Sequence, residues 1–305
     1  MGLHGFEELR READAERPAV RVIAVGGADP TVLIALNEAQ QRGWVSPLLS
    51  GVKSEIEKVA DSCNVSLDAF TIIDSTDPAA AAVAEIRAGR ASMLMKGQIA
   101  TPDLMKAVLH QEHGLRTGKT LCQIVLMEIL RDQRRFLMGD TGLCIQPDFR
   151  QKREILEHEI AAARCLGVEH PAIAVMSATE KVTSAMPDTE EAAEFQRLCE
   201  AGEFGSARVQ GPLSFDLAYA RDAGDKKRIA GSVVGEADGM LFADLLSGNL
   251  TVKGIMYTAD CRFGGVVWGA AAPIVFMSRA DQVETRLNSL VYALRCRNLW
   301  SEFQP

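Results

Sequence analysis

The sequence lacks the features that identify secreted, membrane-bound and metal-binding proteins. Its first residues form a charged amphipathic stretch instead of a basic segment followed by an apolar run, which argues against a secretory signal. No apolar window reaches membrane-spanning length. Seven cysteines are scattered without any C-x-x-C pair, so neither a zinc site nor a disulfide framework is indicated. We therefore expect a cytoplasmic protein with reduced thiols that does not bind a membrane.

The chain also lacks the surplus of basic residues that is typical of nucleic-acid-binding proteins. Its 305 residues carry a formal net charge of −8, with a pI near 5.3. The turn "AVGGAD" does not have the G-x-G-x-x-G spacing of a dinucleotide site. With 47% apolar and 24% charged residues, the composition is that of a globular protein with one large or two medium domains. Small molecules, and not nucleic acid, are the expected partners.

Short β-rich runs alternate with helical patterns, which predicts an α/β fold with a largely parallel sheet. The first strand covers residues 20–25, and Asp29 and Pro30 are expected to cap and open a helix that stops at Gly43. Further helices are expected at about 148–166 and 281–299. Methionines in the apolar runs should lie in the core: Met93, Met95, Met127, Met138 and Met176.

One pair of apolar runs interrupts the alternation. Residues 121–130 and 134–142 are separated by too few residues for a helix, which predicts antiparallel neighbours and a change of sheet or domain. We expect two α/β domains with mixed, largely parallel sheets and an interdomain cleft. Residues 1–139 and 283–305 would form the first domain and residues 140–282 the second. Ligands of such sheets bind beyond the carboxyl ends of the strands.

Polar residues recur at the predicted strand ends. Glycine lets the backbone approach an anion closely, helix starts supply free N–H groups, and hydroxyl, lysine and arginine side chains add donors. This recurrence predicts an anion-binding cleft. The residues are Lys96, Gly97 and Thr101, then Asp140 and Thr141 between Gly139 and Gly142, then Gly248, Asn249 and Lys253, and finally Ser278 and Arg279.

Several blocks resemble those of the phosphate acetyltransferase/phosphate butyryltransferase family. They are "MLMKGQIATPDLMKAVL", "GDTGLCIQPDFRQKREIL", "AIAVMSATEKVTSAMPDTEEA", "VQGPLSFDLA" and "PIVFMSRADQVETRLNSL", and the Ser-Arg-Ala-Asp form is closer to the butyryltransferase branch. The resemblance implies an isocitrate/isopropylmalate dehydrogenase-like fold and a homodimer. It also implies reversible transfer of an acyl group between coenzyme A and phosphate, with acyl phosphate as a product. Coenzyme A would be a substrate, and no metal or redox cofactor is implied.

The resemblance also implies roles for three residues near the C-terminus. Ser278 would hydrogen-bond the coenzyme A sulfur, and Arg279 would hold the phosphoryl group and the developing oxyanion. The acetyltransferase branch has an aspartate base where this chain has Thr285, so Asp281 is the first candidate for the base and Glu284 the second. A serine at this point is also a natural helix N-cap.

Two alternative functions remain open on the sequence. Departures such as Thr285 and the "FADLLSGN" block allow a catalytically impaired homologue that binds coenzyme A or acyl phosphate. Asp238 and Asp244 allow a metal-dependent dehydrogenase of the same fold. His110 and His113 have no Cys or His partner at metal spacing, and a structural role at a helix end is the simpler interpretation.

Overall fold

The computed structural model describes residues 2–276 and 282–303 of the chain. The chain divides into two compact units. Unit 1 comprises Met1–Gly5 and Thr120–Phe263, and unit 2 comprises Phe6–Lys119 and Gly264–Pro305. Both units are α/β with mixed, largely parallel strand pairing, as the alternation of apolar runs predicted.

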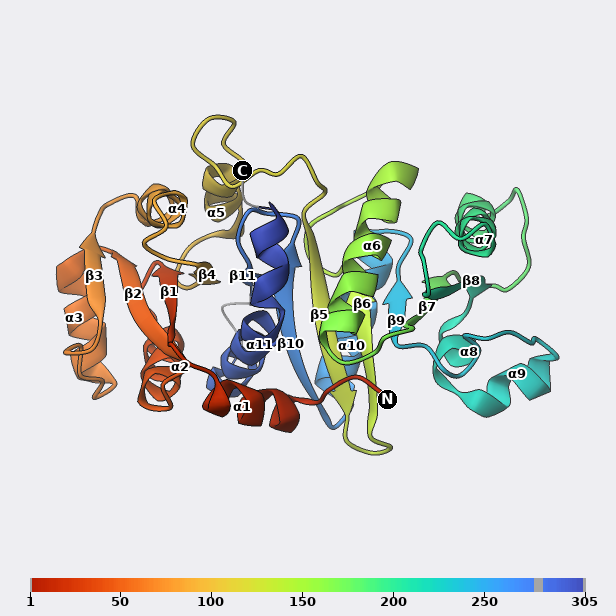
Figure 1. The fold of residues 1–305 in the computed structure, drawn as a ribbon, viewed down its shortest axis with the longest axis horizontal. Coiled ribbons are helices and arrows are strands. Elements are labelled where there is room, and N and C mark those ends of the chain that lie inside the picture. The colour runs from red at the N-terminus through yellow and green to blue at the C-terminus, as the bar shows by residue number, and fades with distance from the viewer. Residues whose placement is uncertain (1, 277–281, 304–305) are drawn as a thin grey trace. The chain divides into compact units, whose positions relative to one another are not determined.

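Unit 2 is built on parallel strands, which Figure 1 shows in the order β3-β2-β1-β4. β11 continues the order beside β4, with Val275 opposite Met95, and pairs antiparallel with β10. The strands are β1 (Val20–Val25), β2 (Val45–Gly51), β3 (Thr71–Asp74), β4 (Met93–Lys96), β10 (Cys261–Trp268, which begins in unit 1) and β11 (Ile274–Val275). The helices are α1 (Phe6–Ala15), α2 (Pro30–Gln41), α3 (Lys53–Ser62), α4 (Pro78–Arg87), α5 (Thr101–Val108) and α11 (Val283–Cys296), followed by the 3-10 helix η1 (Arg297–Phe303).

The local signals of the first strand–helix unit are confirmed. β1 covers Val20–Val25, and Asp29 caps α2 by accepting the N–H groups of Thr31 and Val32 at 2.9 and 3.2 Å. Gly43 has a φ of +76°, the left-handed conformation that glycine adopts without strain. These agreements are expected, because capping and turn residues act on their immediate neighbours.

Unit 1 carries strands in the order β5-β6-β9-β7-β8, and α6 packs on β6 and β9 (Figure 1). Its strands are β5 (Cys122–Ile129), β6 (Arg134–Gly139), β7 (Ala172–Met176), β8 (Arg208–Leu213) and β9 (Gly239–Leu241). Its helices are α6 (Phe149–Cys165), α7 (Pro187–Glu200), α8 (Phe215–Tyr219), α9 (Arg221–Lys227) and α10 (Leu245–Thr258). All five methionines assigned to the core from the sequence are buried.

β5 and β6 are antiparallel neighbours, as predicted from the short connection between their apolar runs. Both strands belong to unit 1, whereas the predicted division assigned residues 120–139 to the other part of the chain. The contacts that β6 makes with β9 and α6 group it with the residues that follow it. The predicted domain boundaries at 139/140 and 282/283 therefore differ from the unit boundaries at 119/120 and 263/264.

Two further findings concern the chemistry of the chain as a whole. All seven cysteines are free thiols, and each is buried or half-buried. Burial raises the pKa of the Cys122 thiol well above its usual value, so this group is protonated and unreactive. Among the residues that the structure describes, no helix is long and apolar enough to cross a bilayer.

Candidate functional site

The predicted substrate-binding residue Lys96 ends β4 in unit 2, where it is 3% exposed. The next residues run alongside the end of β1: Gly97 N–H donates to the Val25 carbonyl at 2.9 Å, and Gln98 N–H donates to the Gly26 carbonyl at 2.8 Å. A Cβ on Gly97 would overlap the Gly26 carbonyl oxygen. Glycine is therefore required here because two strand-end loops approach each other closely.

Thr101 is the first residue of α5 and follows this loop directly. Its N-cap is Ala100, which has no side-chain oxygen to accept the first N–H groups of the helix. The start of α5 therefore keeps the partial positive charge and donor groups that favour an anion. Lys96, Gly97 and Thr101 thus lie on one continuous strand–loop–helix segment of unit 2, as the sequence predicted.

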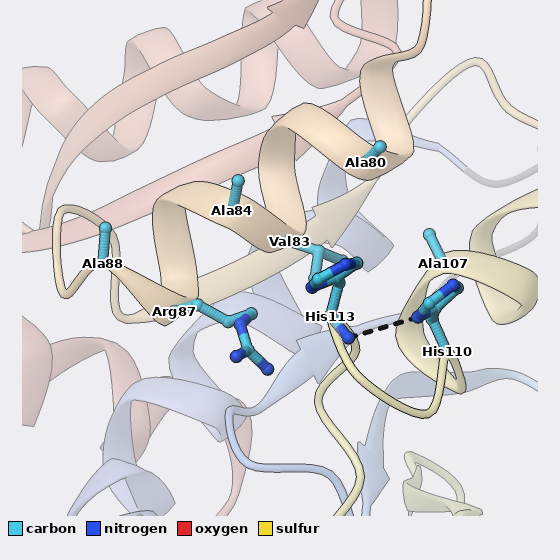
Figure 2. Close-up of a pocket in the computed structure, with 8 residues that line it drawn as sticks. All are labelled: Ala80, Val83, Ala84, Arg87, Ala88, Ala107, His110 and His113. Atoms are coloured by element: carbon cyan, nitrogen blue, oxygen red, sulfur yellow. Dashed lines mark hydrogen bonds between the residues drawn. The ribbon is translucent and has the colours of Figure 1, made fainter.

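Two adjoining pockets lie between α4 and α5. One, of about 490 Å³, is lined by residues that include Ile99, Asp103 and Lys106. The other, of about 580 Å³, is shown in Figure 2; it has an alanine-rich wall from α4 and contains Arg87. Both are lined by Ala80, Ala107 and His110. Neither Lys106 nor Arg87 was predicted from the sequence, although Lys106 follows Thr101 by little more than one helical turn.

The two histidines of this region stabilise a turn. Their rings stack with centroids 5.1 Å apart, and His110 Nδ1 accepts the backbone N–H of His113 at 3.2 Å (Figure 2). The same atom accepts the backbone N–H of Glu112 at 3.3 Å. The structure therefore gives His110 a structural role just after α5. In this role the His110 ring accepts backbone N–H groups.

In unit 1, the carboxylate of Asp140 organises the loop that follows β6. Asp140 Oδ1 accepts N–H groups from Gln123 and Gly142 at 2.6 and 3.1 Å. Its Oδ2 accepts N–H groups from Leu143, at 3.0 Å, and from Cys144. The side chain is buried, and this burial raises the pKa of Asp140 even though the N–H groups act in the opposite direction. Asp140 therefore holds the loop together from inside.

Thr141 and α10 complete this part of the site. Thr141 is 1% exposed, its N–H donates to the Gln123 carbonyl at 3.2 Å, and its carbonyl accepts from Asn249 Nδ2 at 2.8 Å. Gly248 lies where a Cβ would overlap the Asp140 carbonyl oxygen. Asp140, Thr141, Gly248 and Asn249 are thus brought together within unit 1. Lys253 lies one turn beyond Asn249 on α10 and is exposed.

The placement of Gly248 and Asn249 at a strand end is wrong. β9 ends at Leu241, and both residues lie inside α10. Asp244 caps this helix by accepting the Ser247 N–H at 2.8 Å, and Ser247 completes a capping box, which starts the helix before Gly248. Gly248 therefore allows α10 to approach the Asp140 loop closely. Whether Asn249 and Lys253 bind substrate stays a prediction.

A buried carboxyl group lies behind the same loop. Glu159 of α6 is 0% exposed, and its Oε1 accepts the Met240 N–H of β9 at 2.8 Å. Its Oε2 has no hydrogen-bond partner among the residues that the structure describes. Burial raises the pKa of Glu159 to about 8, so the group is mostly protonated at neutral pH. No sequence pattern marks this site, because Glu159 lies in an ordinary amphipathic helix.

The predicted catalytic residues Ser278, Arg279 and Asp281 lie outside the described residues. The neighbouring positions are informative about the base. Thr285 is a buried residue in the first turn of α11. Glu284 is 54% exposed and pairs with Arg10 at 2.7 Å, so its carboxylate already has a cationic partner. Asp281 remains the first candidate for the base.

The carboxylates considered for a metal have backbone partners instead. Asp238 Oδ2 accepts the Ala172 N–H at 2.8 Å, and Asp244 caps α10. Across residues 2–276 and 282–303, no group of three or more His, Cys, Asp or Glu side chains is placed to hold a metal ion. Both aspartates therefore stabilise the main chain of unit 1.

Comparison with known proteins gives consistent matches over most of the chain. A family model described as phosphate acetyl/butaryl transferase matches residues 75–294. The phosphate butyryltransferase of Clostridium acetobutylicum is 31% identical over 95% of this chain and 97% of its own length. The phosphate acetyltransferase of Rickettsia felis is 35% identical over 94% of this chain and 83% of its own. A solved branched-chain phosphotransacylase from Enterococcus faecalis V583 superposes with a TM-score of 0.80 at 28% identity, covering 91% of this chain and 99% of its own.

Proposed function

Because the chain belongs to the phosphate acetyl/butaryl transferase family, as its sequence blocks predicted, we propose that it transfers a short-chain acyl group reversibly between coenzyme A and inorganic phosphate. The observation that carries the proposal is the match over nearly the full length of both this chain and a phosphate butyryltransferase. Butyryl, branched-chain and acetyl groups are the candidate acyl groups. The chain is 31% identical to a relative of one branch and 35% identical to a relative of the other, so all three acyl groups stay candidates.

The proposed reaction brings two anions together. Phosphate attacks the thioester carbonyl, the carbon–sulfur bond breaks, and coenzyme A leaves as a thiolate that takes up a proton. Positive side chains and backbone N–H groups at a fixed position lower the repulsion and stabilise the developing oxyanion. The start of α5 in unit 2 offers backbone N–H groups, which supports the proposal, and Lys96 is the cation that we expect to act with them.

The residues that act on the reacting atoms follow from the family resemblance. Ser278 would donate to the coenzyme A sulfur, Arg279 would hold the phosphoryl group, and Asp281 would accept the thiol proton in the reverse direction. A strand, β11, ends just before this segment, and a helix, α11, begins just after it. Regular elements on both sides supply the rigid support that catalytic side chains need.

The wider setting of the reaction is part of the proposal. We expect two α/β domains of the isocitrate/isopropylmalate dehydrogenase type, with the reaction in the cleft between them. We also expect a cytoplasmic homodimer that uses no metal and no redox cofactor. Coenzyme A, its acyl thioester, phosphate and acyl phosphate are the expected partners.

The test is phosphate-dependent release of free thiol. Purified protein is mixed with acetyl-, propionyl-, butyryl- or isobutyryl-CoA, with and without phosphate, and thiol is followed with a colour reagent. Release that requires phosphate for at least one substrate supports the proposal. Release that ignores phosphate for every substrate contradicts it. Ser278→Ala and Arg279→Ala should each lower the rate by on the order of a hundredfold.

One observation favours a second candidate function. Thr285 occupies the position of the aspartate base in the acetyltransferase branch, and it is buried in α11. A homologue that binds coenzyme A or acyl phosphate without turnover would fit this change. Calorimetry that shows coenzyme A binding, together with absent thiol release in every arm of the panel, would support this candidate over the first.

A further inference from the structure

The guanidinium of Arg286 is buried where three segments of unit 2 meet. The side chain is 1% exposed, although it comes from a helix near the C-terminal end of the chain. Its Nε donates to Thr31 Oγ1 at 2.7 Å, its Nη1 donates to the Lys96 carbonyl at 2.9 Å, and its Nη2 lies 3.3 Å from Asp29 Oδ2. One planar group therefore connects α11, the start of α2 and the end of β4.

The partners of Arg286 are suited to hold a buried cation. Asp29 uses its Oδ1 to cap α2, accepting from Thr31 N–H and Thr31 Oγ1 at 2.9 and 2.7 Å, and its Oδ2 faces the guanidinium. Asp29 is itself buried. An arginine presents several N–H donors in a fixed plane, so it reaches separate acceptors at once; a lysine ammonium at a single point does not. Breaking such a buried pair leaves an uncompensated charge inside the protein.

The carbonyl that Arg286 holds belongs to the residue before the predicted anion-binding loop. Beyond Lys96, backbone bonds from Gly97 and Gln98 fix the chain to the end of β1. Gly26, at the end of β1, has a φ of +75° and packs against the Gln98 carbonyl. Because Arg286 binds the Lys96 carbonyl and the α2 cap together, it sets where this loop begins relative to both helices.

The same contact anchors the helix that follows the predicted catalytic segment. β11 lies beside β4, with Val275 opposite Met95, and α11 is tied through Arg286 to the next residue of β4, Lys96. The elements before and after residues 276–282 are therefore both fixed to the end of one strand. A small displacement of either element would alter the geometry at which reacting groups are delivered.

We propose that Arg286 is a positioning residue for acyl transfer, an inference that rests on the proposed function. Arg286 directs its guanidinium to Thr31, to the Lys96 carbonyl and to Asp29, so its effect on the reaction is indirect. It acts through the Lys96 carbonyl and through the start of α11. It thereby fixes the position of the anion-binding loop relative to the helix that follows the catalytic segment. Arg286 therefore contributes mainly to the rate of transfer and to kcat/KM for phosphate, and only secondarily to the affinity for coenzyme A.

The test compares Arg286→Lys and Arg286→Met with Arg10→Met as a matched control. Arg10 also ties an element to α11, donating to Glu284 and Asn288 at 2.7 and 2.9 Å, but both of these acceptors belong to α11 itself. For each protein, kcat, the KM for phosphate, the Kd for coenzyme A and the Tm are measured. We expect both Arg286 variants to lose on the order of tenfold to a hundredfold in kcat/KM for phosphate, with the Kd for coenzyme A changed by less than about threefold.

The control and a rescue experiment separate positioning from stability. Arg10→Met should lower the Tm while its kcat/KM for phosphate stays near the wild-type value. In Arg286→Ala, millimolar guanidinium should restore part of the lost rate, whereas the same concentration of sodium should not, because only guanidinium reproduces the planar donors. An Arg286→Lys variant that folds and turns over like the wild type would overturn the inference. It would also be overturned if, at a similar Tm, the Arg286 variants lost no more of the rate than Arg10→Met does. A wild type without phosphate-dependent release would instead overturn the proposed function, and this inference with it.

Discussion

The buried carboxyl group of Glu159 makes the stability of the protein depend on pH, and Glu159→Gln should remove this dependence. Glutamine has the shape of a protonated glutamate and is neutral at every pH used. Its carbonyl oxygen is able to accept the Met240 N–H that Glu159 Oε1 accepts at 2.8 Å. The substitution therefore keeps the contact with β9 and removes the ionisable group.

The sign and size follow from the pKa of the group in the two states. The folded pKa of Glu159 is raised to about 8, whereas an exposed glutamate has a pKa of about 4.3. Between these values, unfolding releases a proton that the folded state retains, so the free energy of unfolding falls by about 1.4 kcal/mol for each unit of rising pH. The loss begins above about pH 4.3 and is complete a little above pH 8. From pH 5 to pH 8 it amounts to about 4 kcal/mol.

The assay is the Tm of the wild type and of Glu159→Gln at several pH values between 5 and 9. A change of about 4 kcal/mol corresponds to about 6 °C in Tm for a protein of this size, because the entropy of unfolding is about 2.1 cal/mol/K per residue, so the variant should gain by about that amount relative to the wild type as pH rises. Glu157→Gln is the matched control, since Glu157 lies in the same helix but is 41% exposed and pairs with Arg153. Parallel curves for the wild type and Glu159→Gln across the whole range would refute the reasoning.

Two further substitutions test the loop after β6. Gly248→Ala should destabilise the protein by about 2 kcal/mol and lower the rate of transfer, because the new methyl group overlaps the Asp140 carbonyl; Gly254→Ala in the same helix has open space and should stabilise it by about 0.5–1 kcal/mol. Asp140→Asn should cost about 3 kcal/mol, because an amide N–H₂ would face two of the backbone N–H groups that the carboxylate accepts. Asp148→Asn, which keeps the N-cap of α6, should cost less than about 0.5 kcal/mol. Denaturant unfolding measures the free energy of unfolding of all four variants, and thiol release measures the rate of Gly248→Ala.

Each of these two pairs of variants has an outcome that would contradict the prediction. If Gly248→Ala were as stable as Gly254→Ala, the close approach of α10 to the Asp140 loop would be wrong. If Asp140→Asn behaved like Asp148→Asn, the Asp140 carboxylate would not be holding the loop.

The parts of the fold that the sequence predicted are those determined by neighbouring residues. Asp29 and Pro30 open α2 through contacts within one helical turn, and the short connection between β5 and β6 leaves room only for an antiparallel pair. The same local chemistry explains the error at Gly248. A Gly-Asn pair after an apolar run is typical of a strand end, but the Asp244 capping box starts a helix before it is reached.

The parts that the sequence did not predict depend on contacts between distant residues. Arg286 lies 190 residues from Lys96 and 257 from Asp29, so no window of the sequence contains this cluster. Glu159 is a glutamate in an amphipathic helix, and only the packing of α6 against β9 shows that it is buried. The candidate substrate-binding residues were predicted because polar groups recur at the expected strand ends, whereas the groups that hold them in place follow no such local pattern.

These hidden groups share a chemical principle that bears on catalysis. Asp29 in unit 2 and Asp140 in unit 1 are buried carboxylates next to segments that we expect to bind anions. Exposed, each would repel phosphate and coenzyme A. Instead, Asp29 accepts backbone N–H groups and faces Arg286, and Asp140 accepts four backbone N–H groups. Each carboxylate orders the main chain around it, so the adjoining loops gain rigidity, and the N–H groups that it accepts offset its negative charge beside the segments expected to bind anions.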